Sequence, residues 1–329
     1  MLRNSQNVNC PSPPSRTNVM GFQSPPQNPR PGAGGFVKLQ AYAKINLFLD
    51  VLRKRPDGYH DIVSVMQSVG LCDDLRISCS ETTGERVSLT CNDPTLPTDE
   101  SNLVVKAAKL LTEKYKIEYP IQIELTKRIP VGAGLAGGSS DCAATLRGIN
   151  TLFQLNIPMK ELTEIGRTLG ADVPFCLMGG TALCEGIGEI LTPLPQHPPC
   201  HIVLITPGIH VSTAEVFSRL NLVKTSIPGH TSDTKGLISL KNALANGNVS
   251  QIAASFYNVF TPVTAGLHPE ISDIISELRS CDALGASMSG TGSAVFAYFD
   301  NETYAQRACD KIGTNFKTYT AFLTQPNSI

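Results

Sequence analysis

The segment from Pro130 to Leu146, PVGAGLAGGSSDCAATL, carries four glycines and two serines within its first eleven residues. It follows the alternating apolar pattern of residues 121–129, which predicts a strand, and it turns into helix-forming sequence. Glycine lets backbone N–H groups come close to an anion, and the N–H groups at a helix N-terminus carry partial positive charge. A strand, a glycine-rich loop and a helix in this order indicate a phosphate-binding loop.

Two familiar phosphate loops do not fit this context. Gly132, Gly134 and Gly137 satisfy G-x-G-x-x-G, but the sequence that follows is helical and polar, without the strand and acidic residue that a dinucleotide-binding unit needs. The P-loop pattern fails because Gly138 stands where its lysine must be. A tight structural turn is the remaining alternative, and the glycines together with two serines at a helix start disfavour it.

Other residues with suitable chemistry are scattered along the chain. Lys44 and Asn46 lie inside an apolar strand pattern, Asp172 precedes Val-Pro, and Tyr59 and His60 follow a charged turn. Each has a structural alternative, since a strand lysine can pair with an acid and Asp172 can be a turn or cap residue. His60 can be a solvated histidine, and Tyr59 and Phe217 can be core aromatics. The other histidines show no ligand spacing and are expected to be structural; they are His197, His201, His210, His230 and His268.

Four motifs in order resemble one family. P-x-G-A-G-L-x-G-G-S-S-D, at residues 130–141, is similar to the ATP loop of the GHMP kinase superfamily, with Ala136 in place of a frequent glycine. Residues 43–47 with 55–60, residues 170–175 and residues 289–293 resemble the corresponding segments of the 4-diphosphocytidyl-2-C-methyl-D-erythritol kinase family. The resemblance covers residues 36–320, and the order of the motifs makes it specific.

The resemblance implies ATP-dependent phosphorylation of the 2-hydroxyl of 4-diphosphocytidyl-2-C-methyl-D-erythritol, a step of the non-mevalonate (methylerythritol phosphate) route to isoprenoids. Asp172 would accept the hydroxyl proton as general base. Lys44 would keep Asp172 ionised and would offset the charge that develops on the transferring phosphoryl group. Asn46 would bond the substrate near this hydroxyl, and His60 the polar edge of a cytosine held between Tyr59 and Phe217.

The same resemblance assigns ATP binding to the loop, through Pro130, Val131, Gly132, Ala133, Gly134, Leu135, Ala136, Gly137, Gly138, Ser139 and Ser140. Mg²⁺ is expected with ATP because it neutralises phosphate charge. No acidic ligand for it can be named from the sequence, although Ser139 or Ser140 would contribute. The two alternatives are another kinase of the superfamily, such as a mevalonate or homoserine kinase, and a binding module that has lost catalysis.

The expected fold is α+β, a two-domain GHMP kinase fold with the active site in the cleft between the domains. Residues 36–196 would form the N-terminal ATP-binding domain and residues 197–325 the C-terminal domain, joined near the proline cluster at 194–200. Strands are expected at 45–49, 62–69, 75–80, 87–91 and 201–207, and helices at 103–115, 159–169 and 213–220. Ser139, Ser140 or Asp141 would cap the helix that follows the loop. The Pro/Ser/Asn-rich residues 1–35 are expected to be disordered.

The composition of the chain argues against several classes of binding partner and site. A net charge of −1 gives no electrostatic reason to expect nucleic acid or an anionic membrane surface. No run of roughly 18 apolar residues is present, and the 10 cysteines include no Cys-x-x-Cys pair, which argues against a membrane span and a zinc ribbon. We expect a cytoplasmic monomer or homodimer, with a plastid location as the alternative if residues 1–35 are a transit peptide.

Overall fold

The computed structural model describes residues 30–32, 35–80, 85–220, 234–315 and 319–327. Most of the predicted disordered extension, residues 1–35, therefore lies outside the described residues, as does His230. Where the extension is described, the Gly32 N–H donates to the Leu152 carbonyl at 2.7 Å. This contact joins the segment ahead of the first strand to the C-terminal end of helix α2 (Gly137–Leu152).

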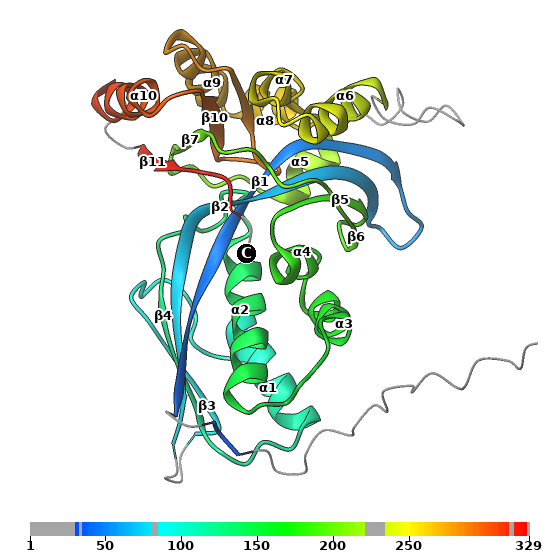
Figure 1. Ribbon diagram of the computed structural model, residues 1–329, viewed down its shortest axis with the longest axis vertical. Helices are drawn as coiled ribbons and strands as arrows, with labels where there is room; N and C mark the ends of the chain where they lie inside the picture. Colours follow the sequence, from blue (N-terminus) through cyan, green and yellow to red (C-terminus); the bar gives the residue numbers. More distant parts are fainter. Residues whose placement is uncertain (1–29, 33–34, 81–84, 221–233, 316–318, 328–329) are drawn as a thin grey trace, which may run out of the picture.

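A long, bent antiparallel hairpin is the centre of the first sheet (Figure 1). Its strands are β1 (Phe36–Lys54) and β2 (His60–Cys79). The seven-stranded sheet runs β3-β4-β2-β1-β8, with β5 pairing β2 and β6. Its other strands are β3 (Val87–Cys91), β4 (Ile121–Thr126), β5 (Thr181–Gly186), β6 (Ile190–Pro193) and β8 (Tyr257–Asn258).

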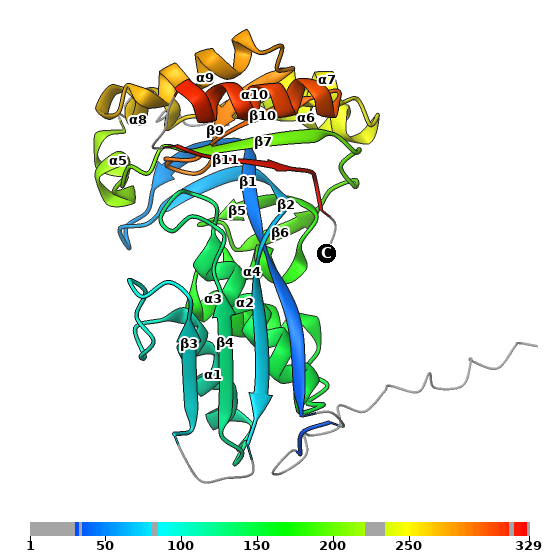
Figure 2. The ribbon, with the colours of Figure 1, turned by 90° about the vertical axis from the view of Figure 1, so that its left-hand side faces the viewer.

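Four helices pack on one face of this sheet (Figures 1 and 2). They are α1 (Leu103–Lys114), α2, α3 (Met159–Leu169) and α4 (Val173–Met178). Asn102 caps α1, because its side chain accepts the Val104 N–H at 2.9 Å. Strand β4 alternates buried and exposed residues, as expected for a strand with one face on a core.

The second half of the chain forms a four-stranded antiparallel sheet in the order β11-β7-β10-β9. Its strands are β7 (His201–Thr206), β9 (Gly285–Met288), β10 (Val295–Phe299) and β11 (Thr320–Thr324). Figure 2 shows helices of this half above the sheet. The helices are α5 (Thr213–Arg219), α6 (Thr234–Ala245), α7 (Val249–Ala254), α8 (Thr261–Leu267), α9 (Glu270–Ser280) and α10 (Glu302–Asn315).

The two halves share a hydrophobic core. Ala43, Ile45 and Leu47 of β1 pack in one cluster with Leu204 of β7 and Phe296 of β10. Strand β8, from the second half, also pairs with β1 in parallel. The predicted domain boundary near residue 197 stays a prediction, because the core and the first sheet both draw on residues from either side of it.

Most predicted elements are present, with two corrections. The predicted strands at 62–69 and 75–80 are parts of one strand, β2, because the chain passes through Gly70 while it stays paired with β1 on both sides. The predicted side-chain cap of α2 is wrong: Ala136 occupies the N-cap position with φ 57°, and no side chain bonds the helix end. Helix α4 was not expected from the sequence.

Gly148 sets how closely α2 approaches the sheet. An added Cβ at this position would lie 2.5 Å from Ile77 Cδ1 and 2.8 Å from Leu39 Cδ1. Interiors this dense do not absorb an extra methyl group without displacing neighbours.

Gly148→Ala should therefore lower the free energy of unfolding by about 1–3 kcal/mol. Gly313→Ala in α10 is the matched control, because nothing lies within 4 Å of its added Cβ. The control should be neutral or gain up to about 1 kcal/mol from helix propensity. Urea denaturation followed by circular dichroism measures both, and an equal effect of the two substitutions would contradict this packing account.

Candidate active site

The glycine-rich loop is fixed through its carbonyl groups. The Ala133 carbonyl accepts the Ala294 N–H at 3.0 Å, and the Leu135 carbonyl accepts the Lys44 N–H at 3.1 Å. Between them, the Gly134 carbonyl accepts the Ser289 hydroxyl at 2.8 Å. In a trans peptide unit the N–H points away from the carbonyl of the preceding residue, so these anchors turn the following amides away from the protein.

The loop amides are correspondingly unpaired. From Gly132 to Ser139, no backbone N–H has a hydrogen-bond partner among the described residues. Positive φ values at Gly132 (69°), Gly134 (80°) and Ala136 (57°) produce this winding path into α2. A run of eight open amides at a helix N-terminus is a strong anion-binding arrangement.

A cavity of about 410 Å³ lies over these amides. The loop forms one wall, and Leu96, Pro97 and Leu103 give another wall an apolar surface. Asp172, Thr213 and Thr291 also line it, so the cavity is bounded by both halves of the chain. Gly134 is needed here, because an added Cβ would collide with the Ser289 carbonyl.

Ser140 does not line this cavity. It is 2% exposed, and its hydroxyl donates to the Tyr42 carbonyl at 2.5 Å. The hydrogen of this hydroxyl is therefore already used within the protein, and a contribution of Ser140 to ATP or metal binding stays a prediction. Ser139, by contrast, lines the cavity and lies near Gly170, whose added Cβ would be 3.9 Å from the Ser139 hydroxyl.

Lys44 reaches the loop from the buried strand β1. Its Nζ donates to Asn46 Oδ1 at 2.7 Å and lies 3.7 Å from where a Cβ on Gly290 would be. Gly290 in turn touches Gly134, so the ammonium stands where the loop meets residues 289–293. The pairing of β1 with β2 is irregular on both sides of Lys44 and Asn46, and such bulges re-aim side chains.

Asn46 is a buried connector, only 1% exposed. Its Oδ1 accepts from Lys44 and from the Gly290 N–H at 2.9 Å, and its Nδ2 donates one hydrogen to Ser64 Oγ at 2.8 Å. A second Nδ2 hydrogen remains. Positioning Lys44 is the role that the contacts show, and a bond to substrate stays a prediction.

Asp172 stands at the start of α4 with its side chain uncommitted. It occupies the N-cap position of α4, yet its side chain makes no capping bond. Among the described residues it has no ion-pair partner within 4.0 Å, Lys44 included. Both charges act on the same buried thiol, since Asp172 raises and Lys44 lowers the pKa of Cys176, which burial raises most. A cavity-lining carboxylate of this kind is free to take a proton.

Of the three ring-bearing residues expected to hold cytosine, two are in contact with each other and Tyr59 is not part of that contact. The rings of His60 and Phe217 stack at 4.7 Å between centroids, and Phe260 covers Phe217 from a further direction at 4.6 Å. Tyr59 is 61% exposed and has no ring contact with Phe217 among the described aromatic pairs. Burial, and to a smaller extent Lys54, lowers the pKa of His60, so the ring is neutral at pH 7.

Helix α5 links these rings to the cavity. Thr213, at its first position, lines the cavity and lies 3.1 Å from Thr291 between hydroxyl oxygens. Phe217 follows four residues later on the same helix face. Sequence reasoning missed Thr213, although the i, i+4 spacing to Phe217 is a signal that could have suggested it.

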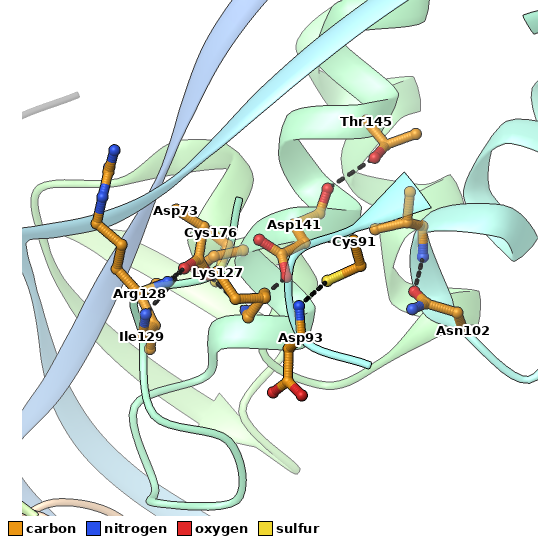
Figure 3. A network of polar contacts seen from close by, with 12 residues as sticks. Asp73, Cys91, Asp93, Asn102, Lys127, Arg128, Ile129, Asp141, Thr145 and Cys176 are labelled. Carbon is orange, nitrogen blue, oxygen red and sulfur yellow. Dashed lines mark hydrogen bonds and ion pairs between the residues drawn. The ribbon is translucent and has the colours of Figure 1, made fainter. Parts of the chain in front are cut away.

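A buried charge cluster lies beside the glycine-rich loop, and sequence reasoning missed it entirely. Two of its members, Lys127 and Asp141, are among the residues that line the cavity. Lys127, the second residue before Ile129, lies between Asp73 of β2 and Asp141 of α2 (Figure 3). Its Nζ is 2.7 Å from Asp141 Oδ2 and also pairs with Asp73. We call these three residues the charge triad. Asp141 is 3% exposed, and its Oδ1 has no hydrogen-bond partner among the residues that the structure describes.

Burial, reinforced by Asp73 and opposed by Lys127, raises the pKa of Asp141 from 3.8 to about 7. The folded state therefore holds this proton more tightly than the unfolded state. The resulting stabilisation is complete below about pH 4 and is lost as the pH rises to about 7.

Asp141→Asn removes this titration while it keeps an acceptor for Lys127. Its melting temperature relative to the native chain should rise between pH 5 and pH 8, by the equivalent of about 2–3 kcal/mol. Scanning fluorimetry across this range measures the difference, with Asp74→Asn, an exposed neighbour, as control. A constant difference at all pH values would show that Asp141 is ionised throughout.

Within the described ranges, no three His, Cys, Asp or Glu side chains gather in a way that would hold a metal ion. Nor does any helix of the described chain have the length and apolar character needed to cross a membrane.

Comparison with known proteins places the chain in a family. Residues 102–180 match the GHMP kinases N terminal domain and residues 238–318 the GHMP kinases C terminal. The 4-diphosphocytidyl-2-C-methyl-D-erythritol kinase of Lachnoclostridium phytofermentans is 45% identical over 83% of this chain and 91% of its own length. The Acetivibrio thermocellus enzyme of the same name is 44% identical over 88% and 98%.

Solved structures agree on the fold. A crystal structure of 4-(cytidine 5'-diphospho)-2C-methyl-D-erythritol kinase superposes with a TM-score of 0.74 at 31% identity, covering 88% of this chain and 99% of that one. A homoserine kinase from Cytophaga hutchinsonii gives a TM-score of 0.72 at 23% identity, over 90% and 96%, which shows a shared fold alone. The predicted GHMP kinase fold, with its N- and C-terminal parts, is confirmed. The chain is therefore an ATP-dependent small-molecule kinase of the GHMP superfamily and belongs to the 4-diphosphocytidyl-2-C-methyl-D-erythritol kinase family.

Proposed function

We propose that this chain transfers the γ-phosphoryl group of ATP to the 2-hydroxyl of 4-diphosphocytidyl-2-C-methyl-D-erythritol, in the methylerythritol phosphate route to isoprenoids. The run of open amides from Gly132 to Ser139 is the observation that carries the proposal. Family membership supports the choice of acceptor, because the relatives bear that name at 43–46% identity.

The triphosphate would lie along the loop. Eight amides and the helix dipole supply fixed partial positive charge, and the loop cannot collapse onto itself because its carbonyls are held by β1 and residues 289–294. The apolar wall of Leu96, Pro97 and Leu103 suits the flat base of the nucleotide. Phosphoryl transfer needs alignment and charge stabilisation more than covalent help, which is what this wall and loop provide.

Asp172 would act as the general base. The substrate hydroxyl passes its proton to the Asp172 carboxylate as its oxygen bonds to the γ-phosphorus, and the bond from that phosphorus to the bridging oxygen breaks to release ADP. Lys44 would offset the negative charge on the transferring group, held in place by Asn46. Asn46 would use its remaining N–H for the substrate.

The cytidine end would lie near the tip of the β1–β2 hairpin. Tyr59 is exposed there and free to cover a base, while His60 and Phe217 form the opposite surface. A neutral His60 ring offers one donor and one acceptor for the polar edge of cytosine.

Mg²⁺ fits the site only as an ion held mainly by the nucleotide. The Ser139 hydroxyl is the more suitable side-chain ligand in the loop, because Ser139 lines the cavity and Ser140 does not. When bound, the ion neutralises phosphate charge, and it usually keeps several waters in such sites.

The domain boundary, the cellular location and the oligomeric state are also proposals. The boundary near residue 197 falls between the segments that match the two GHMP models. A cytoplasmic location follows the bacterial relatives, and a monomer or homodimer remains our expectation.

Substrate choice is the direct test. With ATP in a coupled assay, 4-diphosphocytidyl-2-C-methyl-D-erythritol should be turned over with kcat/KM at least about 10³-fold above homoserine or mevalonate, because only it fills the aromatic hairpin subsite. Equal or greater activity on either unlinked acceptor would refute the proposed substrate and leave the kinase fold intact.

Asp172→Asn tests the base. It should lower kcat by about 10²–10⁴-fold and change ATP affinity little, because the amide keeps the size of the side chain but cannot take the proton. Asp300→Asn, at an exposed carboxylate after β10, is the matched control. Near-native turnover by the Asp172 variant would remove Asp172 from the mechanism.

A further inference from the structure

The charge triad ties together three chain segments that are distant in sequence. Asp73 comes from β2, Lys127 from the turn after β4, and Asp141 from the first turns of α2 (Figure 3). The side chains of all three are nearly inaccessible, at 0%, 6% and 4% exposure. The turn after β4 leads into the glycine-rich loop and α2 follows it, so the triad joins both ends of the loop to β2.

Asp73 holds the beginning of the loop. Its Oδ1 accepts the backbone N–H groups of Arg128 and of Ile129, the latter at 2.8 Å, and its Oδ2 accepts from Lys127 Nζ. A single carboxylate thus fixes the two residues that precede Pro130. Charge-assisted bonds of this kind are stronger than bonds between neutral groups.

Lys127 holds the end of the same loop. Its Nζ reaches Asp141, and an added Cβ on Gly137 would lie 3.1 Å from Nζ and 3.0 Å from Ile129 Cγ2. The first turn of α2 therefore rests directly on the lysine and on Ile129. Both ends of the loop are anchored to Asp73, one directly and the other through Lys127.

The net charge of the charge triad indicates that it holds the loop in position and does not attract the phosphates. With Asp73 ionised, the triad is neutral while Asp141 holds its proton and carries a net charge of −1 when Asp141 has lost it, so in neither state does it attract a triphosphate. Asp93, whose carboxylate feels the charge of Lys127, adds a further negative charge nearby. A cluster whose purpose was to attract phosphate would have the opposite balance.

We propose that Asp73 is a positioning residue for nucleotide binding, which holds both ends of the glycine-rich loop in the geometry that leaves its amides open. The proposal rests on the proposed function, because it takes the loop to be the ATP site. It concerns the nucleotide alone, since within the described part of the chain the hairpin residues Tyr59 and His60 have no hydrogen bond, ion pair or ring contact with the triad.

Asp73→Asn is the test, with Asp74→Asn as matched control. The neighbouring Asp74 is 44% exposed and pairs with the Arg128 guanidinium at the surface. In Asp73→Asn, the KM for ATP and the Kd of a non-hydrolysable ATP analogue should both rise about tenfold or more. The KM for the cytidyl substrate and kcat at saturating ATP should stay within about twofold, and Asp74→Asn should match the native chain.

A double variant covers the case in which Asp73→Asn does not fold. Lys127→Met with Asp141→Asn keeps the net charge of −1 that the fully ionised triad has, and it keeps the bonds from Asp73 to the Arg128 and Ile129 amides. It removes the lysine that links Asp73 to α2, so the KM for ATP should again rise while the KM for the cytidyl substrate does not.

The outcomes separate the two proposals. An unchanged KM for ATP in Asp73→Asn or in the double variant, with the native chain active, would overturn the positioning role alone. Equal losses for ATP and for the cytidyl substrate would also overturn it, because they indicate general destabilisation. A native chain that neither binds the ATP analogue nor turns over the cytidyl substrate would overturn the proposed function instead.

Discussion

The arrangement of the site depends on hydrogen bonds to three successive loop carbonyls, those of Ala133, Gly134 and Leu135. Each peptide unit can direct its carbonyl or its N–H into the protein, and here the carbonyls are the groups that are satisfied internally. The amides have no hydrogen-bond partner among the described residues, which costs free energy, and a bound anion would supply the missing hydrogen bonds. A glycine-rich loop without these anchors could bond to itself and close the site.

Lys44 of β1 helps to arrange the loop region through both its backbone and its side chain. The Lys44 N–H donates to the Leu135 carbonyl, and its Nζ, oriented by Asn46, stands beside Gly290 at the junction of loop and cavity. Alternation along β1 places Ala43, Ile45 and Leu47 in the core shared with the second half and turns Lys44 and Asn46 the other way. The burial that anchors the strand therefore also sets the position of the ammonium.

Local patterns were predictable from the sequence, and distant pairings were not. Glycine spacing between a strand and a helix identified the loop, and the alternation of β4 was visible in a short window. Gly70 appeared to end a strand, whereas pairing on both of its sides keeps β2 continuous. Ser140 was expected to bind phosphate because it belongs to the glycine-rich motif; its hydroxyl donates to the carbonyl of Tyr42, 98 residues earlier, which no local pattern encodes. Asp73 and Lys127 have ordinary sequence surroundings, and only the packing of β2 against the end of β4 brings them together.

The second half of the chain lines the cavity and also holds the glycine-rich loop in its conformation. Two of the three carbonyl anchors come from Ala294 and Ser289, and this segment is itself held by Asn258, whose Nδ2 donates to the carbonyls of Met288 and Gly290. Asn258 belongs to β8, the strand that joins β1 in the first sheet. A displacement of residues 289–294 would thus release the loop carbonyls even if residues 36–196 kept their fold. The glycine-rich loop is encoded in the first half of the sequence, but its unpaired amides depend on both halves.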